Sequence, residues 1–171
     1  MNLDSIPVLR SSRLTLRALG AADYPALLAL AHDAEVTRYL HEGAAPSAHD
    51  VANRVAGSLR QWELRGYGMM GMDDEEGFVG RLGIFHPQSM DDPLLVYAIA
   101  RRGWGKGYAT EGLGLLLSWV RAACSLKYVI CHIDQRNSVS ARVAQKFGAI
   151  RDGATIRDGT ELEIWTLPIT T

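Results

Sequence analysis

The sequence predicts an α/β protein in which strands and helices follow one another along a single domain, residues 1–171. Runs with the alternating or continuous apolar pattern of strands are separated by segments with a helical apolar period. The chain is long enough to bury one sizeable core, and no repeat, low-complexity tract or linker divides it. The predicted order is βααβββαβαββ, with about seven strands and about four helices.

The first half of the chain is expected to hold one strand followed by two helices. Residues 14–18 alternate as a strand does, and Asp23 is suited to cap the helix that follows. Ser47 and Asp50 have the spacing of a capping box, which opens a second helix that Gly66 ends. The buried stripe of this helix is expected to consist of Val51, Val55, Leu59 and Trp62.

A hairpin is expected next, with residues 67–72 and 78–85 paired across the acidic turn 73–77, which is most simply a solvated tip. The remaining predicted elements are strands at 94–100, 128–133, 149–156 and 161–167 and helices at 107–123 and 137–147. The last helix is expected to turn Val139, Val143 and Phe147 inward and to end at Gly148.

The most informative stretch lies between the strand 94–100 and the helix that begins near residue 107. It reads Arg102-Gly103-Trp104-Gly105-Lys106-Gly107-Tyr108-Ala109. Alternating glycines leave the backbone open to a close approach, and a helix start offers unpaired N–H groups and the positive end of a dipole. With the two cationic side chains in the run, the turn is typical of an anion-binding site, most often for phosphate.

Two common phosphate motifs fit this turn poorly. A P-loop needs a Ser or Thr after its lysine, but Gly107 follows Lys106, so no hydroxyl is placed to hold magnesium. A dinucleotide fingerprint beginning at Gly105 would need a third glycine where Thr110 stands, and no acidic residue ends a second strand until Asp134. The pattern that does match is Arg/Gln-x-x-Gly-x-Gly/Ala, over residues 102–107.

This pattern resembles the pyrophosphate loop of the GNAT N-acetyltransferases. The longer stretch Tyr97-Ala-Ile-Ala-Arg-Arg-Gly-Trp-Gly-Lys-Gly-Tyr-Ala-Thr-Glu-Gly-Leu resembles the branch that includes the ribosomal-protein N-terminal (alanine/serine) acetyltransferases. Segments 12–17, 35–40 and 137–149 resemble that branch as well, in the same order along the chain. The resemblance implies a GNAT-type domain with a twisted, mixed and mostly antiparallel sheet.

Acetyl-CoA is the cosubstrate that the resemblance implies. Its pyrophosphate would bind the N–H groups of residues 103–109, with Arg102 and Lys106 beside it. Its pantetheine arm would pair with residues 97–100 like an added strand, in room made by a bulge that splays this strand from the next. The residues expected to contact the cofactor are Ile99, Arg102, Gly103, Trp104, Gly105, Lys106, Gly107, Tyr108, Ala109, Asn137 and Ser140.

The catalytic residues that the resemblance suggests are Ser140 and Glu161. In related enzymes a Ser or Tyr near the thioester protonates the leaving sulfur, and Asn137 would bond the pantetheine unless it serves only as a helix N-cap. Many relatives carry an acidic residue at the start of the fourth predicted strand, where this chain has two leucines. Glu161 on the last strand is therefore the candidate base, whereas Glu111 is expected to have a structural role.

Composition excludes several other classes of protein. A net charge of −1 does not indicate a protein that binds nucleic acid through an excess of basic residues, and no apolar run reaches the length of a membrane span. Neither the two cysteines nor the five histidines have the spacing of a metal site, so no metal is expected. The N-terminus does not have the pattern of a signal peptide, and we expect a cytoplasmic protein with reduced thiols, for which a homodimer is left open.

The function that these observations predict is acetyl-CoA-dependent N-acetylation of a primary amine, foremost the N-terminal α-amine of a protein or peptide. Two alternatives remain open. One is acetylation of a small amine such as a polyamine, an amino acid or an antibiotic, and the other is a non-catalytic acyl-CoA-binding module. An acidic acceptor cleft would favour polyamines or basic peptides, and segments 35–42 and 67–72 are expected to line that cleft.

Overall fold

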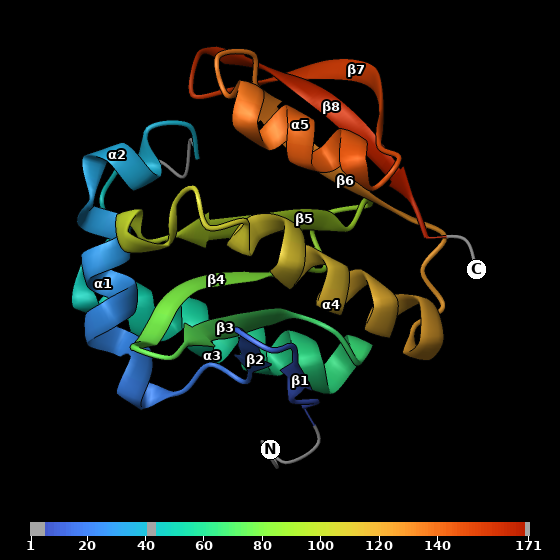
Figure 1. Ribbon diagram of the computed structural model, residues 1–171. Helices are drawn as coiled ribbons and strands as arrows, with labels where there is room; N and C mark the ends of the chain where they lie inside the picture. The colour runs from blue at the N-terminus through green and yellow to red at the C-terminus, as the bar shows by residue number, and fades with distance from the viewer. Residues whose placement is uncertain (1–5, 41–43, 170–171) are drawn as a thin grey trace.

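A single sheet with helices on both faces forms the core of the computed structural model, which describes residues 6–40 and 44–169 (Figure 1). The described strands are β1 (Leu9–Arg10), β2 (Thr15–Arg17), β3 (Met69–Asp74), β4 (Gly77–Phe85), β5 (Leu94–Ile99), β6 (Tyr128–Asp134), β7 (Ile150–Arg157) and β8 (Thr160–Pro168). They lie in the order β1-β2-β3-β4-β5-β6-β8-β7, and only β5 and β6 are parallel neighbours. The predicted α/β class and mostly antiparallel sheet are confirmed.

One described strand more than the expected seven is present. The addition is β1, whose two residues pair with β2. An alternating apolar pattern cannot be recognised over two residues, so only the pairing identifies this strand.

Most helices begin and end where local signals place them, but Asp23, which was expected to cap α1, makes no capping hydrogen bond from its side chain. They are α1 (Tyr24–His32), α2 (Ala34–Thr37), α3 (Ala48–Arg65), α4 (Tyr108–Ala123) and α5 (Ser138–Lys146), with short 3₁₀ turns at Ala21–Asp23 and Arg101–Gly103. The capping box of α3 is present, because Ser47 and Asp50 each accept a backbone N–H of the other, and Gly66 ends the helix in the left-handed conformation. The four-residue α2 is too short to show a period and was not expected.

The helices divide the core into two clusters on opposite faces of the sheet. Side chains of α4 and α5, together with Trp62 of α3, pack in the cluster of Leu82 and Leu95, whereas α1 and the other buried apolar residues of α3 pack on the face of Met69 and Val96 (Figure 1). The prediction that Val139 of α5 points inward is wrong. Val139 is 62 % exposed, because the helix turns Val143 and Ala144 toward the sheet instead.

The parallel neighbours β5 and β6 pair only at Leu94 and Ile130, after which the two strands diverge. The Ala100 N–H donates to Val79 on β4 and the Ile130 N–H donates to Pro93, so alternate residues of β5 present their backbone groups to opposite neighbours. Tyr97 and Ile99 therefore direct N–H and C=O groups toward the side from which β6 has withdrawn. The expected opening between the strands is present, although β5 pairs with β4 without the expected bulge.

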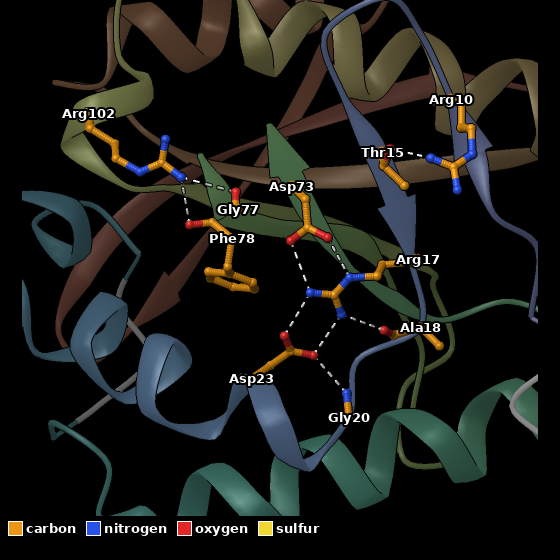
Figure 2. Close-up of polar contacts among 10 residues, drawn as sticks. All are labelled: Arg10, Thr15, Arg17, Ala18, Gly20, Asp23, Asp73, Gly77, Phe78 and Arg102. Carbon is orange, nitrogen blue, oxygen red and sulfur yellow. Dashed lines mark hydrogen bonds and ion pairs between the residues drawn. The ribbon is translucent and has the colours of Figure 1, made fainter. Parts of the chain in front are cut away.

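Arg17 ties the start of the sheet to the turn that precedes α1 (Figure 2). Its guanidinium donates two hydrogen bonds to Asp73 on β3, at 2.5 and 3.0 Å, and two to Asp23, at 2.9 and 2.8 Å. Asp23 is 5 % exposed. Burial alone would raise the pKa of Asp23, but hydrogen bonds from Arg17 and the Gly20 N–H outweigh burial and lower it.

We expect Arg17→Met to lower the free energy of unfolding by about 2–3 kcal/mol, because it leaves a buried carboxylate without its main partner. Arg10→Met is the matched control, since Arg10 makes one exposed hydrogen bond to Thr15. Chemical denaturation at pH 7 measures both. A lowered native pKa means that Asp23 stabilises the fold above its unfolded pKa of about 4 and ceases to do so as the pH falls, so the difference from wild type should shrink in acid. Equal losses in the two variants would contradict the assignment.

Candidate functional site

The glycine-rich turn leads from the end of β5 into α4. After Ile99 the chain forms the 3₁₀ turn Arg101–Gly103 and then a tight loop that ends at Gly107, the N-cap of α4. Gly105 and Gly107 have φ of 73° and 80°. Both lie in the left-handed region that side chains with a Cβ rarely adopt, so the path of the loop requires glycine at these two positions.

The loop presents a row of backbone N–H groups that find no acceptor among the described residues. The first helical hydrogen bond of α4 runs from the Glu111 N–H to the Gly107 carbonyl. The amides before it that have no such acceptor are those of Gly105, Lys106, Gly107, Tyr108, Ala109 and Thr110. A Cβ built at Gly105 would meet no atom within 4 Å, so this part of the loop is open. Converging unpaired amides at a helix N-terminus are the donors that a phosphate group requires.

Residues 103–109 were expected to offer their N–H groups to a ligand, but the first two of these groups are already used inside the loop. The Gly103 and Trp104 N–H groups donate to Ala100 and Arg101, at 2.8 and 3.0 Å. A Cβ at Gly103 would come within 2.8 Å of Ile99 and Val79 side chains, so this glycine serves close packing under the loop. Two of the expected contact residues thus shape the loop through the structural contacts of their backbone.

Arg102 points to the β3–β4 hairpin (Figure 2). Its guanidinium donates to the Gly77 and Phe78 carbonyls, at 3.0 and 2.9 Å, and to Asp74 at 2.6 Å. Burial would raise the pKa of Asp74, but the hydrogen bond and charge of Arg102 outweigh burial and lower it. The acidic turn was expected to be solvated, yet the Asp74 side chain is 1 % exposed, because it anchors the loop through Arg102.

Lys106 lies beside the open amides, and unlike Arg102 and Arg13 it makes no ion pair with a described carboxylate. Its ammonium lies 5.7 Å from the centre of the Tyr108 ring, and the Arg13 guanidinium lies 5.2 Å from the same centre. Arg13 also donates to the Lys106 carbonyl at 3.0 Å and pairs with Glu111. Arg13 was not predicted as a site residue, because a residue 93 positions away in sequence gives no local signal of this contact.

Glu111 has the structural role that was expected of it. Its carboxylate accepts hydrogen bonds from Ser11, at 2.6 Å, and from Arg13. Burial would raise the pKa of Glu111, but these two donors outweigh burial and lower it. The first turn of α4 is thereby fixed to the segment between β1 and β2.

Trp104 covers one end of the open strand edge. Its indole Nε1 donates to the Ile99 carbonyl at 2.8 Å, and 48 % of the residue is exposed. The Ile99 carbonyl was expected to be available to a ligand that extends the sheet. The structure pairs it with Trp104, so the backbone groups of this edge that lack a partner within residues 6–40 and 44–169 are those of Tyr97 and the N–H of Ile99.

On the far side of the opening, the start of α5 faces β5. Asn137 caps the helix, since its Oδ1 accepts the Ser140 N–H at 3.1 Å, so the capping role is confirmed. Ser140 accepts a hydrogen bond from the Tyr97 hydroxyl at 2.9 Å. Tyr97 was expected to contribute its backbone, and the hydroxyl contact adds a side chain that sequence spacing could not indicate.

Glu161 lies at the exposed beginning of β8, where it pairs with Ile156 of β7, and its side chain makes no hydrogen bond or ion pair with the described residues. The β6–β8 register places Leu162 opposite Asp134. Because strand residues alternate between faces, Glu161 lies on the face that α5 covers, together with Trp165. β8 lies on the other side of β6 from the opening, and no contact with a described residue assigns the Glu161 side chain a role.

His132 is a residue that the sequence did not single out. It shares a face of the sheet with Ile130, and through the Leu94–Ile130 pair with Val96 and Ala98 of β5. Its buried Nδ1 has no hydrogen-bond partner among the described residues. Burial, with a smaller contribution from the positive charge of Arg157, lowers the pKa of His132, so the imidazole is neutral at pH 7.

A cavity of about 60 Å³ lies on this same face, between α1, α3 and the sheet. It is mainly apolar, with Leu27, Val51 and Met69 in its lining. The described residues that line it include two arginines, Arg54 and Arg81, and no carboxylate. Both segments expected at an acceptor cleft reach this cavity, through Thr37, Leu40 and Met69, whereas residues 41 and 42 fall outside the described part of the chain.

Two further properties concern residues 6–40 and 44–169. Within these ranges no three His, Cys, Asp or Glu side chains come together in a way that would hold a metal ion. No helix there has the length and apolar character needed to cross a membrane.

Comparisons with solved structures place this fold among acetyltransferases. An acetyltransferase from Agrobacterium tumefaciens str. C58 superposes with a TM-score of 0.81 at 27 % identity, over 94 % of each chain. RimL, a ribosomal L7/L12 α-N-protein acetyltransferase in complex with coenzyme A, gives a TM-score of 0.79 at 16 % identity, over 95 % of this chain and 98 % of that one. Spermidine N-acetyltransferase from Vibrio cholerae, in complex with CoA and spermine, gives 0.74 at 17 %, over 91 % and 94 %.

Sequence comparison agrees. YkkB of Bacillus subtilis (strain 168) is 33 % identical over 112 residues, which make up 61 % of this chain and 60 % of that protein, so the match spans somewhat under two thirds of this curated relative. The family model described as acetyltransferase (GNAT) domain matches residues 13–150, which include the loop, the opening between β5 and β6, and Ser140. The chain belongs to the GNAT acetyltransferase family.

Proposed function

We propose that this protein transfers an acetyl group from acetyl-CoA to a primary amine, foremost the N-terminal α-amine of a protein or peptide. One observation carries the proposal. Six consecutive amides, from Gly105 to Thr110, have no acceptor in the part of the chain that the structure describes, and they stand next to a strand edge that its neighbour has left open. A diphosphate needs the first feature and an amide-containing arm needs the second, and coenzyme A joins the two groups in one molecule.

The chain offers a separate contact for each part of the cosubstrate. The open amides, with Lys106 beside them, would hold the diphosphate, while Arg102, Gly103 and Trp104 keep the loop in shape. Backbone groups of Tyr97 and Ile99 would pair with the pantetheine arm. Asn137 keeps its Nδ2 group available for the same arm, since only its Oδ1 is used in capping.

The reaction is direct attack of the amine on the thioester carbonyl. A backbone N–H of β5 would stabilise the oxyanion of the tetrahedral intermediate, and the Ile99 amide is the one nearest the loop. An α-amine has a pKa near 8, against about 10.4 for a lysine side chain. A free N-terminus therefore loses its proton readily at neutral pH and needs only a weak base.

Ser140 is proposed as the acid that protonates the leaving sulfur, and Glu161 remains the base proposed from the sequence. His132 is a second candidate base. It is neutral at pH 7 and lies on the sheet face that carries the apolar cavity, whereas Glu161 lies on the opposite face.

The cavity also bears on the acceptor. Its apolar walls, with Leu27, Val51 and Met69, suit the side chain of an N-terminal residue. Both kinds of acceptor occur among the structural relatives, RimL acting on a protein α-amine and the Vibrio cholerae enzyme on spermidine. A small-amine acetyltransferase is thus the first alternative, and a non-catalytic acyl-CoA-binding module the second.

The proposal predicts that the protein binds acetyl-CoA with micromolar affinity and releases free thiol when a suitable amine is added. Calorimetry measures the first property. A thiol assay over N-terminal peptides, polyamines and amino acids measures the second and identifies the acceptor class. No heat at millimolar acetyl-CoA would reject the site, while binding without thiol release from any amine would leave the acyl-CoA-binding module.

Gly105→Ala is expected to weaken acetyl-CoA binding at least about tenfold, because a Cβ strains the left-handed backbone that aims the open amides. Gly66→Ala is a matched control, since Gly66 also has φ of 73° and open surroundings but lies at the end of α3. Calorimetry and thermal unfolding should show similar losses of stability in both variants and loss of affinity only in Gly105→Ala. Equal affinities in the two variants would count against the loop.

The two candidate bases can be separated by His132→Gln and Glu161→Gln. If His132 accepts the amine proton, His132→Gln should lower kcat/KM at pH 7 by about 10²-fold or more and remove the acidic limb of the pH profile. That limb should lie below pH 6.5, because the pKa of His132 is lowered. The same loss in Glu161→Gln, with His132→Gln unaffected, would identify Glu161 instead.

A further inference from the structure

The hydroxyl groups of Tyr97 and Ser140 lie 2.9 Å apart, with Tyr97 as the donor. The two residues belong to different sides of the opening, because Tyr97 is on β5 and Ser140 is in the first turn of α5, directly after β6. Backbone pairing between β5 and β6 has already ended at Leu94 and Ile130. The contact therefore spans the opening at the level of the unpaired β5 edge.

The surroundings keep the phenol protonated. The Tyr97 ring packs against the core cluster beneath α4, and burial raises its pKa, against a smaller opposite effect of the bond to Ser140. Because Tyr97 donates to Ser140, the Ser140 hydroxyl proton has no acceptor among the described residues. A hydroxyl that accepts a hydrogen bond is also a stronger donor through polarisation.

We propose that Tyr97 is a positioning residue that acts through Ser140, fixing its hydroxyl toward the leaving sulfur and supplying the proton that Ser140 passes on. This inference rests on the proposed acetyl transfer. It addresses a chemical difficulty of that reaction. An aliphatic hydroxyl alone is a far weaker acid than a thiol, and a phenol stays a stronger acid than an aliphatic hydroxyl even where burial raises its pKa.

The proton transfers balance as follows. When the tetrahedral intermediate collapses, the carbon–sulfur bond breaks and its electron pair goes to sulfur. The Ser140 proton moves to that sulfur, giving the free thiol, and the Tyr97 proton moves to Ser140 Oγ. The phenolate regains a proton from solvent, and the proton that the acceptor nitrogen loses leaves through the base, so the protein returns to its starting state.

Tyr97→Phe tests the inference, because it removes the hydroxyl and keeps the packed ring. With an accepted amine, kcat should fall about tenfold while the Kd for acetyl-CoA stays within twofold of wild type. Ser140→Ala should lower kcat at least as much. Because the two hydroxyls form one pathway, the double variant should be no slower than Ser140→Ala. Tyr128→Phe is the control, since it removes an exposed tyrosine's hydrogen bond to Asp92 elsewhere on the sheet.

A merely structural tie would change melting temperature or cosubstrate affinity and would leave kcat as in the Tyr128 control. Unchanged kcat in Tyr97→Phe, or losses that multiply fully in the double variant, would overturn the relay while leaving acetyl transfer intact. A wild-type protein that binds acetyl-CoA but releases no thiol with any amine would contradict the proposed function and the relay together. The two failures are therefore distinguishable.

Discussion

The site depends on the early separation of β5 and β6. Elsewhere in the sheet neighbouring strands satisfy one another's backbone groups along most of their length, but this parallel pair meets only at Leu94 and Ile130. An unpaired strand edge inside a protein is costly unless something else pairs with it. Trp104 supplies one partner, for the Ile99 carbonyl, and the remaining groups of Tyr97 and Ile99 face the opening. The fold thus holds an incomplete ladder next to a loop rich in free amides.

Ion pairs fix that loop from three sides. Arg102 joins it to the β3–β4 hairpin through Asp74, and Arg13 joins its end to the first turn of α4 through Glu111. Arg101 pairs with Asp33, at 2.8 Å, in the turn between α1 and α2. The last contact links the loop to the elements that border the apolar cavity. Since preorganised donors bind a ligand without having to be ordered first, these pairs would favour tight binding at the proposed site.

Local chemistry made most of the fold and the course of the glycine-rich loop predictable from the sequence. The capping box at Ser47, the left-handed glycines and the apolar periods of α3 and α4 all depend on neighbouring residues, and the structure contains them at the expected places. The identity of the family followed from motifs in the same order. What the sequence could indicate was therefore the path of the backbone and the positions of its free donors.

Side-chain partners far apart in the chain could not be predicted in this way. Arg102 was expected to face phosphate because it borders the glycines, yet its partner Asp74 is 28 residues away on the hairpin. Asp74 was expected to be solvated for the same reason. The Tyr97–Ser140 contact joins residues 43 positions apart, and the isolated Nδ1 of His132 depends on burial by several strands. Spacing carries no information about such pairs, which exist only once the sheet has formed.

Amide chemical shifts during a titration with coenzyme A test the central claim most directly, because they report on each backbone N–H separately. The account predicts the largest changes at residues 105–110, accompanied by changes at Tyr97 and Ile99 on the open edge of β5. Saturable binding that shifts a different group of amides, with residues 105–110 unmoved, would contradict it.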